Sequence, residues 1–185
     1  MPDALTARAR EIAAVARAIL ENEGPQALTM RRLADQLGIR APSLYKHFRD
    51  KTALEVAIMI DGFEEAASAF ETATAEVADP LRAFAETYRV FAKAHPHVYR
   101  LMTERPLPRD QLPEGLEART AAPLLRATGD RVRARAAWAF IHGLTVLELN
   151  DRLPDDGLTG PAWQVGIQQF RQHQPGRVDV GEVNS

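Results

Sequence analysis

Apolar residues recur along this chain at the three- and four-residue spacing that places side chains on one face of an α-helix. Over residues 5–22, Ile12, Ala16 and Leu20 share one face, while most of the charged side chains lie on the other faces. Gly24 is followed by proline, and this pair predicts the end of the segment. The first segment is therefore expected to be an amphipathic helix with one buried face.

The same periodicity continues along the chain and is interrupted by glycine and proline. Thr29 and Asp50 are expected N-caps, because their side-chain oxygens can accept a hydrogen bond from the first helical turn. Three prolines predict that 105–114 is a loop, and Pro123 predicts a kinked or split helix. The later helices are expected at 30–37, at a short stretch from about 41 that turns Leu44 and Phe48 inward, and at 51–75, 81–94, 97–104, 114–127, 131–153 and 161–172. The pattern predicts an all-α fold.

The composition supports a globular helical protein and narrows its chemistry. Aromatic residues make up 6% of the chain and apolar residues 45%. The absence of cysteine excludes disulfides, thiolate catalysis and cysteine metal sites, and it fits a reducing compartment. The first residues carry an acid and no apolar stretch of a signal peptide, and no apolar run is long enough to span a membrane. We therefore expect a cytoplasmic protein with no membrane partner.

The net charge of −2 conceals an uneven distribution between the two ends of the chain. Residues 1–53 carry nine Lys and Arg against six Asp and Glu, a net charge of +3. The remaining residues carry 14 basic and 19 acidic side chains, a net charge of −5. A basic N-terminal part on an acidic remainder is the distribution expected if only the N-terminal part meets a phosphate backbone.

The most informative segment, residues 29–48, reads TMRRLADQLGIRAPSLYKHF. It predicts two short helices that meet at Gly38, where the chain needs a left-handed turn. The inward positions are all apolar, namely residues 33, 34, 37, 39, 44 and 48. The outward positions are rich in hydrogen-bond donors, namely residues 31, 32, 40, 43, 45, 46, 47 and 49. This arrangement is typical of a helix-turn-helix that enters the major groove of DNA.

The segment closely resembles the TetR family of bacterial regulators, whose members carry a stretch like T-x-R-x-L-A-x-x-L-G-[VI]-x-x-x-[ST]-L-Y-x-H-[FV]-x-[ND]-K. The resemblance covers about residues 8–60. A shorter motif, Trp138-Ala-Phe-Ile-His142-Gly143, resembles a subgroup whose ligand-binding domain carries a Trp…His-Gly signature. The resemblance implies a helix-turn-helix domain over 1–53, a ligand-binding and dimerisation domain over 54–173 and a flexible tail over 174–185.

Carried over position by position, the resemblance implies two sets of DNA contacts. Bases would meet Arg31, Arg40, Ala41, Pro42 and Ser43, and phosphates would meet Thr29, Tyr45, His47 and Lys51. Lys46 lies between the two sets and could serve in either. The side-chain chemistry agrees with these roles, because an arginine can donate two hydrogen bonds to a guanine and a lysine places a positive charge beside a phosphate. A compact three-helix unit with an unused basic face is the alternative interpretation of the same residues.

The helix predicted over 131–153 is apolar on two faces, which predicts burial on both. One stripe contains Val132, Ala136, Phe140, Gly143, Leu144 and Leu147, and the other contains Trp138, His142, Thr145 and Leu149. One face would cover the interior of the subunit and the other would meet a second subunit. The pattern does not decide which of the two stripes faces the second subunit. The resemblance likewise implies a homodimer paired through the last two long helices.

A small-molecule pocket is expected among the middle helices. Its candidate lining residues are Met59, Phe63, Tyr88, Phe91, Tyr99, Met102, Trp138 and His142. Aromatic and methionine residues at helical spacing are usually plain core, so a packed core is the favoured interpretation of each one and a pocket lining is the alternative. His95 and His97 flank a proline at a helix junction and have no evident acidic partner, so no metal is expected.

These observations predict a DNA-binding transcriptional regulator, a repressor on the resemblance, released from a palindromic operator by a small-molecule effector. The chain has no Gly-x-Ser-x-Gly nucleophile motif, no glycine-rich phosphate-binding loop and no His-Glu-x-x-His metal-binding helix. We therefore expect neither an enzyme nor a bound cofactor. The alternative is an architectural or cell-division DNA-binding protein of the same fold that ignores ligands. In either case we expect a cytoplasmic, nucleoid-associated bacterial protein.

Overall fold

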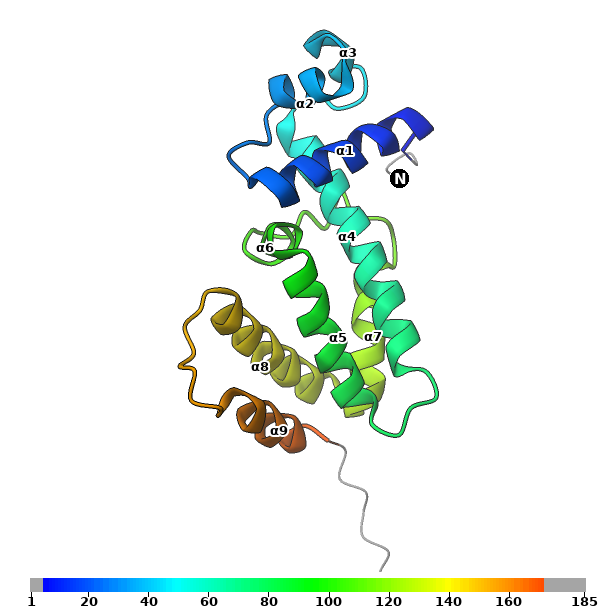
Figure 1. Ribbon diagram of the computed structural model, residues 1–185. Coiled ribbons are helices and arrows are strands. Elements are labelled where there is room, and N and C mark those ends of the chain that lie inside the picture. The colour runs from blue at the N-terminus through cyan, green and yellow to red at the C-terminus, as the bar shows by residue number, and fades with distance from the viewer. Residues whose placement is uncertain (1–4, 172–185) are drawn as a thin grey trace, which may run out of the picture.

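The computed structural model describes residues 5–171, and in this range the chain forms nine α-helices and no strand (Figure 1). The helices are α1 (Ala7–Glu23), α2 (Met30–Leu37), α3 (Ala41–Leu44), α4 (Lys51–Thr74), α5 (Pro80–Ala94), α6 (Pro96–Thr103), α7 (Leu116–Thr128), α8 (Arg131–Leu149) and α9 (Thr159–Gln169). The predicted all-α class is confirmed. We call α1–α3 the head and α5–α9 the body, with α4 running from one into the other.

The head forms around apolar side chains that three short helices turn toward one another. Ile12 and Ala16 of α1 and Leu33 of α2 are completely buried. Local sequence sets the ends of the helices, because the Thr6 side chain caps α1 and the Thr29 side chain caps α2. The burial of this small core therefore depends on helices whose lengths are set by their own caps.

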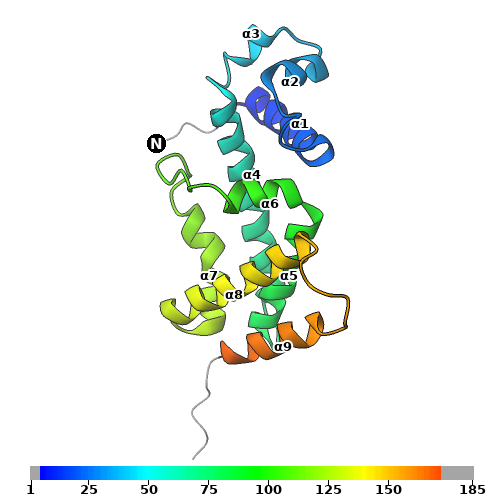
Figure 2. The ribbon, with the colours of Figure 1, turned by 90° about the vertical axis from the view of Figure 1, so that its left-hand side faces the viewer.

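Helix α4 connects the head to the body, as two views at right angles show (Figures 1 and 2). It packs against α1 near the head and against α5, α6 and α7 in the body. Asp50 caps its N-terminus by accepting a hydrogen bond from the Ala53 amide at 2.7 Å. Gly62 lets α6 approach closely, since a Cβ there would lie 2.7 Å from Val98 and 2.8 Å from the Met102 sulfur.

Polar contacts also join the head to the body. Arg17 of α1 pairs with Asp61 and Glu65 of α4. Glu21 of α1 accepts backbone hydrogen bonds from His97 at 3.3 Å and Val98 at 2.7 Å. Helix α6 has no cap from its own N-cap side chain, so a carboxylate of the head satisfies the exposed amides at its start.

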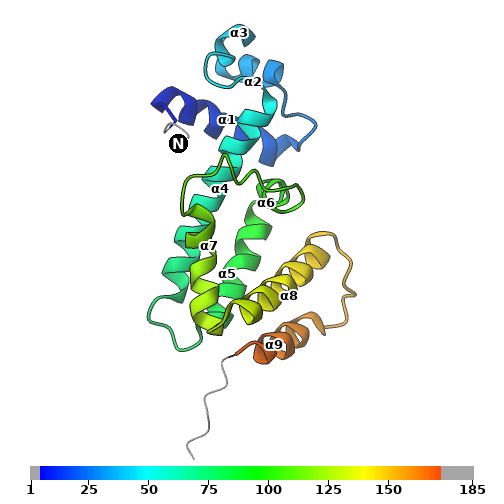
Figure 3. The same cartoon turned by 180° about the vertical axis from the view of Figure 1, so that it is seen from behind.

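The last two helices, α8 and α9, lie side by side on one flank of the body (Figures 1 and 3). Phe140 of α8 packs over Gly166 of α9 and forms an edge contact with Trp163 at 5.9 Å between ring centroids. A Cβ at position 166 would lie only 1.9 Å from the Phe140 ring, so glycine permits this close approach.

Three predicted elements differ from the structure. Helix α3 ends at Leu44, because the amides of His47 and Phe48 both donate to the Leu44 carbonyl and close a turn. Helix α7 is not split at Pro123, whose buried ring is accommodated within a continuous helix. Helix α8 ends at Leu149 instead of 153, because Asp151 takes a left-handed backbone conformation with a φ of 51°. The tail over 174–185 lies outside the described residues.

The Gly166→Ala variant tests the contact between α8 and α9. We expect a loss of about 1–3 kcal/mol from the displaced Phe140 ring, offset in part by the roughly 1 kcal/mol that alanine gains in a helix. Gly160→Ala is the matched control, because position 160 lies in the same helix with nothing within 4 Å of an added Cβ. Urea unfolding at equal protein concentration measures both, and equal stability of the two variants would contradict the close contact.

Candidate nucleic-acid interface

The turn between α2 and α3 has the geometry that the sequence predicts. Gly38 adopts the left-handed conformation, with φ of 64° and ψ of 29°, and its amide donates to the end of α2. The Ile39 amide donates to the Ala34 carbonyl at 3.0 Å, which completes the helix C-cap. A side chain with a Cβ would be strained at position 38, so glycine sets the angle at which the chain leaves α2.

The predicted inward face of the helix-turn-helix is confirmed. Leu33, Ala34, Leu44 and Phe48 are buried, with Leu33 and Leu44 fully excluded from solvent. Leu37 and Ile39 are half-buried and pack against the same core. Phe48 reaches this core from the turn that follows α3, so the shorter helix does not alter which side chains face inward.

The predicted contact residues lie on α2 and α3, in the residues that flank these helices and at the start of α4, and none of them is buried. Thr29, Arg31, Arg40, Pro42, Tyr45, Lys46 and His47 are exposed, and Ala41, Ser43 and Lys51 are half-buried. Tyr45 is 53% exposed, which is unusual for a large aromatic side chain without a partner. The Thr29 oxygen accepts the Arg32 amide, and its hydroxyl hydrogen remains available to a phosphate oxygen.

Two adjacent arginines of α2 have different surroundings. Arg32 pairs with Glu23 of α1 at 2.6 Å and donates to Gln36 at 2.8 Å. Its pKa is raised chiefly by the hydrogen bond to Glu23. Arg31 is exposed on the same helix. Arg32 therefore serves the packing of α2 on α1, whereas Arg31 is the one that the resemblance assigns to a base.

Lys51 begins α4 and is held from two sides. Its Nζ donates to the Pro25 carbonyl at 3.3 Å and lies 3.6 Å from a Glu55 oxygen. The other Glu55 oxygen accepts from Arg105 at 2.6 Å. Sequence analysis did not predict this chain of charges, because Arg105 lies 50 residues from Glu55.

In the body, three of the predicted pocket residues form one polar cluster. The Tyr99 hydroxyl lies 2.7 Å from His142 Nδ1, and the Tyr88 hydroxyl lies 3.2 Å from both groups. The Trp138 ring lies beside His142, with 5.9 Å between the ring centroids. Burial raises the pKa of both tyrosines and lowers that of His142, so all three groups are neutral near pH 7. The cluster is a set of neutral donors and acceptors able to orient a polar ligand.

The other predicted pocket residues contribute to the core. Met59, Phe91 and Met102 are buried, and Phe63 packs against them from a half-buried position. Two cavities within residues 5–171 are lined by other side chains, and Met59, Phe63, Phe91 and Met102 pack in or against the buried core. A ligand among them would need the body helices to separate, and the assignment stays a prediction.

The side chain of Glu148 in α8 is 7% exposed. Arg89 donates to it, Lys93 lies 3.2 Å away and the Trp163 indole donates at 3.3 Å. Burial alone would raise the pKa of this carboxyl, but these hydrogen bonds outweigh burial and lower it. Glu148 thus ties α8 to α5 and α9 as a buried anion.

Helices α8 and α9 also present a surface of exposed apolar and small side chains. Ala137, Ile141 and Thr145 face the interior of the subunit. The exposed apolar residues of the terminal pair and its connecting loop are Val132, Trp138, Leu147, Leu158 and Val165. Gly143 faces open space, so another helix could approach there. An exposed apolar area of this kind is typical of a protein interface.

Within residues 5–171, no helix is long and apolar enough to cross a membrane. In the same range no group of three or more His, Asp and Glu side chains is arranged to hold a metal ion. The expectation that the protein uses neither metal nor cofactor stays a prediction.

Two family models match this chain, one in its N-terminal part and one in its C-terminal part. Residues 12–58 match a family model described as bacterial regulatory proteins, tetR family. Residues 81–170 match a model described as the Tetracyclin repressor-like C-terminal domain. Neither description names a Trp…His-Gly subgroup, so that finer assignment stays a prediction.

Similar proteins agree with these matches. The HTH-type transcriptional regulator Rv0681 of Mycobacterium tuberculosis is 31% identical over 148 residues, which cover 74% of this chain and 67% of that protein. A structure of a Rhodococcus sp. RHA1 protein matches with a TM-score of 0.66 and 26% identity, over 93% of this chain and 100% of that one. A TetR variant from Acinetobacter baumannii AYE, solved in complex with minocycline, matches with a TM-score of 0.60 and 25% identity, over 86% and 91% of the two chains.

The adjacent arginines provide a matched test of the interface. Arg31→Ala is expected to relax base preference at one position of each half-site, by about 1–3 kcal/mol of discrimination. Arg32→Ala is expected to keep the base preference and lower the unfolding midpoint, because it removes the pair with Glu23. Binding to a set of single-base variants of a bound DNA fragment, with thermal unfolding alongside, measures both effects. Equal loss of base preference in both variants would contradict the assignment of Arg31.

Proposed function

The chain belongs to the tetR family of bacterial regulatory proteins, and on this premise we propose that it is a homodimeric repressor released from its operator by a small-molecule effector. Binding to DNA and regulation of transcription follow from the family. The repressor output, the palindromic operator, the dimer and the effector are proposals for this chain. The dimer and the effector site rest on separate parts of the structure, and the palindromic operator follows from the dimer.

The observation that carries the DNA-binding proposal is the division of residues 29–51 into a buried apolar face and an exposed donor-rich face. Arg31, Arg40 and Ser43, with Ala41 and Pro42 beside them, are proposed to meet base edges. The proposed phosphate contacts are Thr29, Tyr45, His47 and Lys51, with Lys46 able to join either set. Hydroxyl, imidazole and ammonium donors would fix the register of the head on the duplex, and the arginines would read sequence.

The dimer is proposed to form through α8 and α9. The exposed apolar residues of these helices would be buried against a second copy, and Gly143 would allow close helix approach. A two-fold dimer presents two α3 helices, which must lie about 34–36 Å apart to enter successive major grooves. The proposed operator is therefore palindromic, because its symmetry must match that of the protein.

The effector is proposed to bind in the body near Tyr88, Tyr99, His142 and Trp138, with Met59, Phe63, Phe91 and Met102 as apolar walls. A related TetR from Acinetobacter baumannii holds minocycline, which supports a small-molecule response in this chain. A ligand that separates the body helices would tilt α4 and move the two heads off the groove spacing. Such a ligand acts only through different affinities for the two arrangements. A ligand-independent architectural role is the less favoured alternative.

Three further assignments complete the proposal. We place the DNA-binding domain at 1–53, the ligand-binding and dimerisation domain at 54–173 and a tail at 174–185. We propose that the chain has no catalytic activity, since it belongs to a family of regulators. We also propose that it acts in the bacterial cytoplasm in association with the nucleoid.

Selection of genomic DNA fragments by the purified protein tests the proposed function and yields an operator. Lys51→Ala and Tyr45→Phe are then expected to weaken binding to all sequences. Lys51→Ala should also reduce the slope of log K against log salt by about one, because one phosphate contact is lost. Fluorescence anisotropy over a salt series measures both. Failure to recover any enriched fragment, or unchanged affinity in both variants, would overturn the proposed interface.

Leu147→Glu tests the dimer surface. Leu147 is 40% exposed on α8, and a buried unpaired carboxylate in its place should weaken dimerisation at least about tenfold. Val77→Glu is the matched control, because Val77 is 41% exposed in the connection between α4 and α5. Sedimentation equilibrium is expected to show loss of dimer only for the first variant. A dimer of unchanged strength in Leu147→Glu would place the interface elsewhere.

A further inference from the structure

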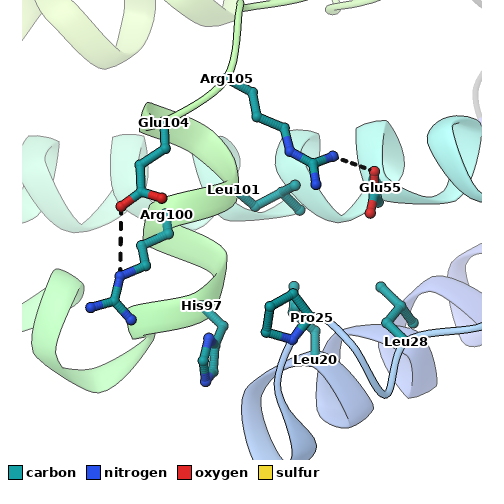
Figure 4. Close-up of a pocket in the computed structure, with 9 residues that line it drawn as sticks. All are labelled: Leu20, Pro25, Leu28, Glu55, His97, Arg100, Leu101, Glu104 and Arg105. Atoms are coloured by element: carbon teal, nitrogen blue, oxygen red, sulfur yellow. Dashed lines mark hydrogen bonds and ion pairs between the residues drawn. The ribbon is translucent and has the colours of Figure 1, made fainter.

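A cavity of about 250 Å³ lies where the head meets the body, apart from the proposed effector site (Figure 4). Its apolar lining comes from Leu20, Pro25 and Leu28 of the head and Leu101 of α6. Its polar lining is Glu55 of α4, His97 and Arg100 of α6, and Glu104 and Arg105, the two residues that follow α6. Figure 4 shows Arg100 and Arg105 on two sides of Leu101, each joined to a carboxylate.

The cavity is bounded by links between the head and the body. On one side, Glu21 of α1 caps the start of α6 at His97 and Val98. On the other side, Arg105 pairs with Glu55 at 2.6 Å. The shape of the cavity therefore depends on how the head is oriented on the body, and a molecule that fills it acts directly on that orientation.

We propose that this cavity is a second ligand site, and that it takes a small amphipathic carboxylate. The leucines and the proline would cover an apolar tail, as in ligand sites with mostly apolar walls and a few polar groups. The carboxylate would pair with Arg105, with Arg100 as the second cation of the rim. Arg105 is 55% exposed and donates to Glu55 from Nη1, so the other donors of its guanidinium can turn to a ligand.

Binding at Arg105 would reach the DNA contact through Glu55, and this step rests on the proposed role of Lys51. The Glu55 side chain is 11% exposed and bridges two cations, with one oxygen near Lys51 and the other on Arg105. A buried carboxylate that loses one partner depends more strongly on the other. A ligand carboxylate on the other donors of Arg105 would compete with Glu55 for this guanidinium. The weakened Glu55–Arg105 pair would then leave Glu55 to draw Lys51 inward, away from the phosphate.

The consequence is a lower affinity for DNA when the cavity is filled. The loss is expected to be about two- to fivefold, the scale of one partly exposed ion pair. The slope of log K against log salt should fall toward that of Lys51→Ala, because the same phosphate contact is lost. This loss of affinity is smaller than that expected from moving the two heads apart. The effector site would therefore change DNA affinity strongly, and the cavity would change it slightly.

The first experiment measures binding of hexanoate, with hexanamide as the neutral control, by calorimetry on the full chain. We expect hexanoate to bind with a dissociation constant of about 1 mM and hexanamide to bind at least about tenfold more weakly. Arg105→Gln should abolish the preference for the carboxylate. Arg109→Gln is the matched control, because Arg109 lies in the same connection and pairs with Glu117. The proposed site is overturned if the unmodified chain binds hexanoate and hexanamide equally well. It is also overturned if Arg105→Gln and Arg109→Gln bind hexanoate equally well.

The second experiment measures DNA affinity at constant ionic strength with and without hexanoate. Arg105→Gln should bind the selected fragment about two- to fivefold more weakly without hexanoate and show no further response. Glu55→Gln should still bind hexanoate and lose the response, because a neutral amide no longer attracts Lys51. An unchanged response in Arg105→Gln would assign hexanoate to another site and overturn the proposal. If no DNA fragment is bound at all, the proposed function fails, and calorimetry alone decides the cavity.

Discussion

Helix α4 runs through one continuous hydrophobic core that the head and the body share, and the helices of both parts are built around it. Its N-terminal part packs against α1 of the head, and the rest packs against α5, α6 and α7. Leu54 and Ile58 are fully buried in its first half, and Phe70 is buried in its second half. Because close-packed side chains resist small deformations, a change around α4 in the body must appear as a change in the direction of the head.

Polar contacts add specificity to this apolar connection. Glu21 caps a helix of the body from the head, and Glu55 joins Lys51 of the predicted DNA surface to Arg105 of the body. Each carboxylate has a partner on another segment of the chain, so each contact depends on the relative position of the two segments. The apolar contacts hold the head and body together, whereas these carboxylates are sensitive to the angle between them.

The helix-turn-helix was largely predictable from sequence, and the effector site was not. Thr29, Gly38 and Asp50 act on neighbouring backbone amides, so their effects depend on a few adjacent residues. The predicted pocket residues Tyr88, Tyr99 and His142 do meet, but the pattern could not distinguish a ligand site from a packed core. Helical periodicity identifies the face of a helix and leaves its partner undefined. For the same reason the pattern does not predict that three side chains of α5 and α9 enclose Glu148.

By itself the sequence determined the helical class, most helix boundaries, the turn at Gly38 and the division of residues 29–51 into inward and outward faces. These features follow from hydrogen bonds and side-chain spacing within a few residues. Only the tertiary structure decided that Arg32 serves packing, that Glu55 bridges Lys51 and Arg105, and that a cavity lies between the head and α6. Those features depend on contacts between separate elements, such as that of Glu55 with Arg105, 50 residues away. Their free energies depend on burial and distance, which exist only after the helices have packed.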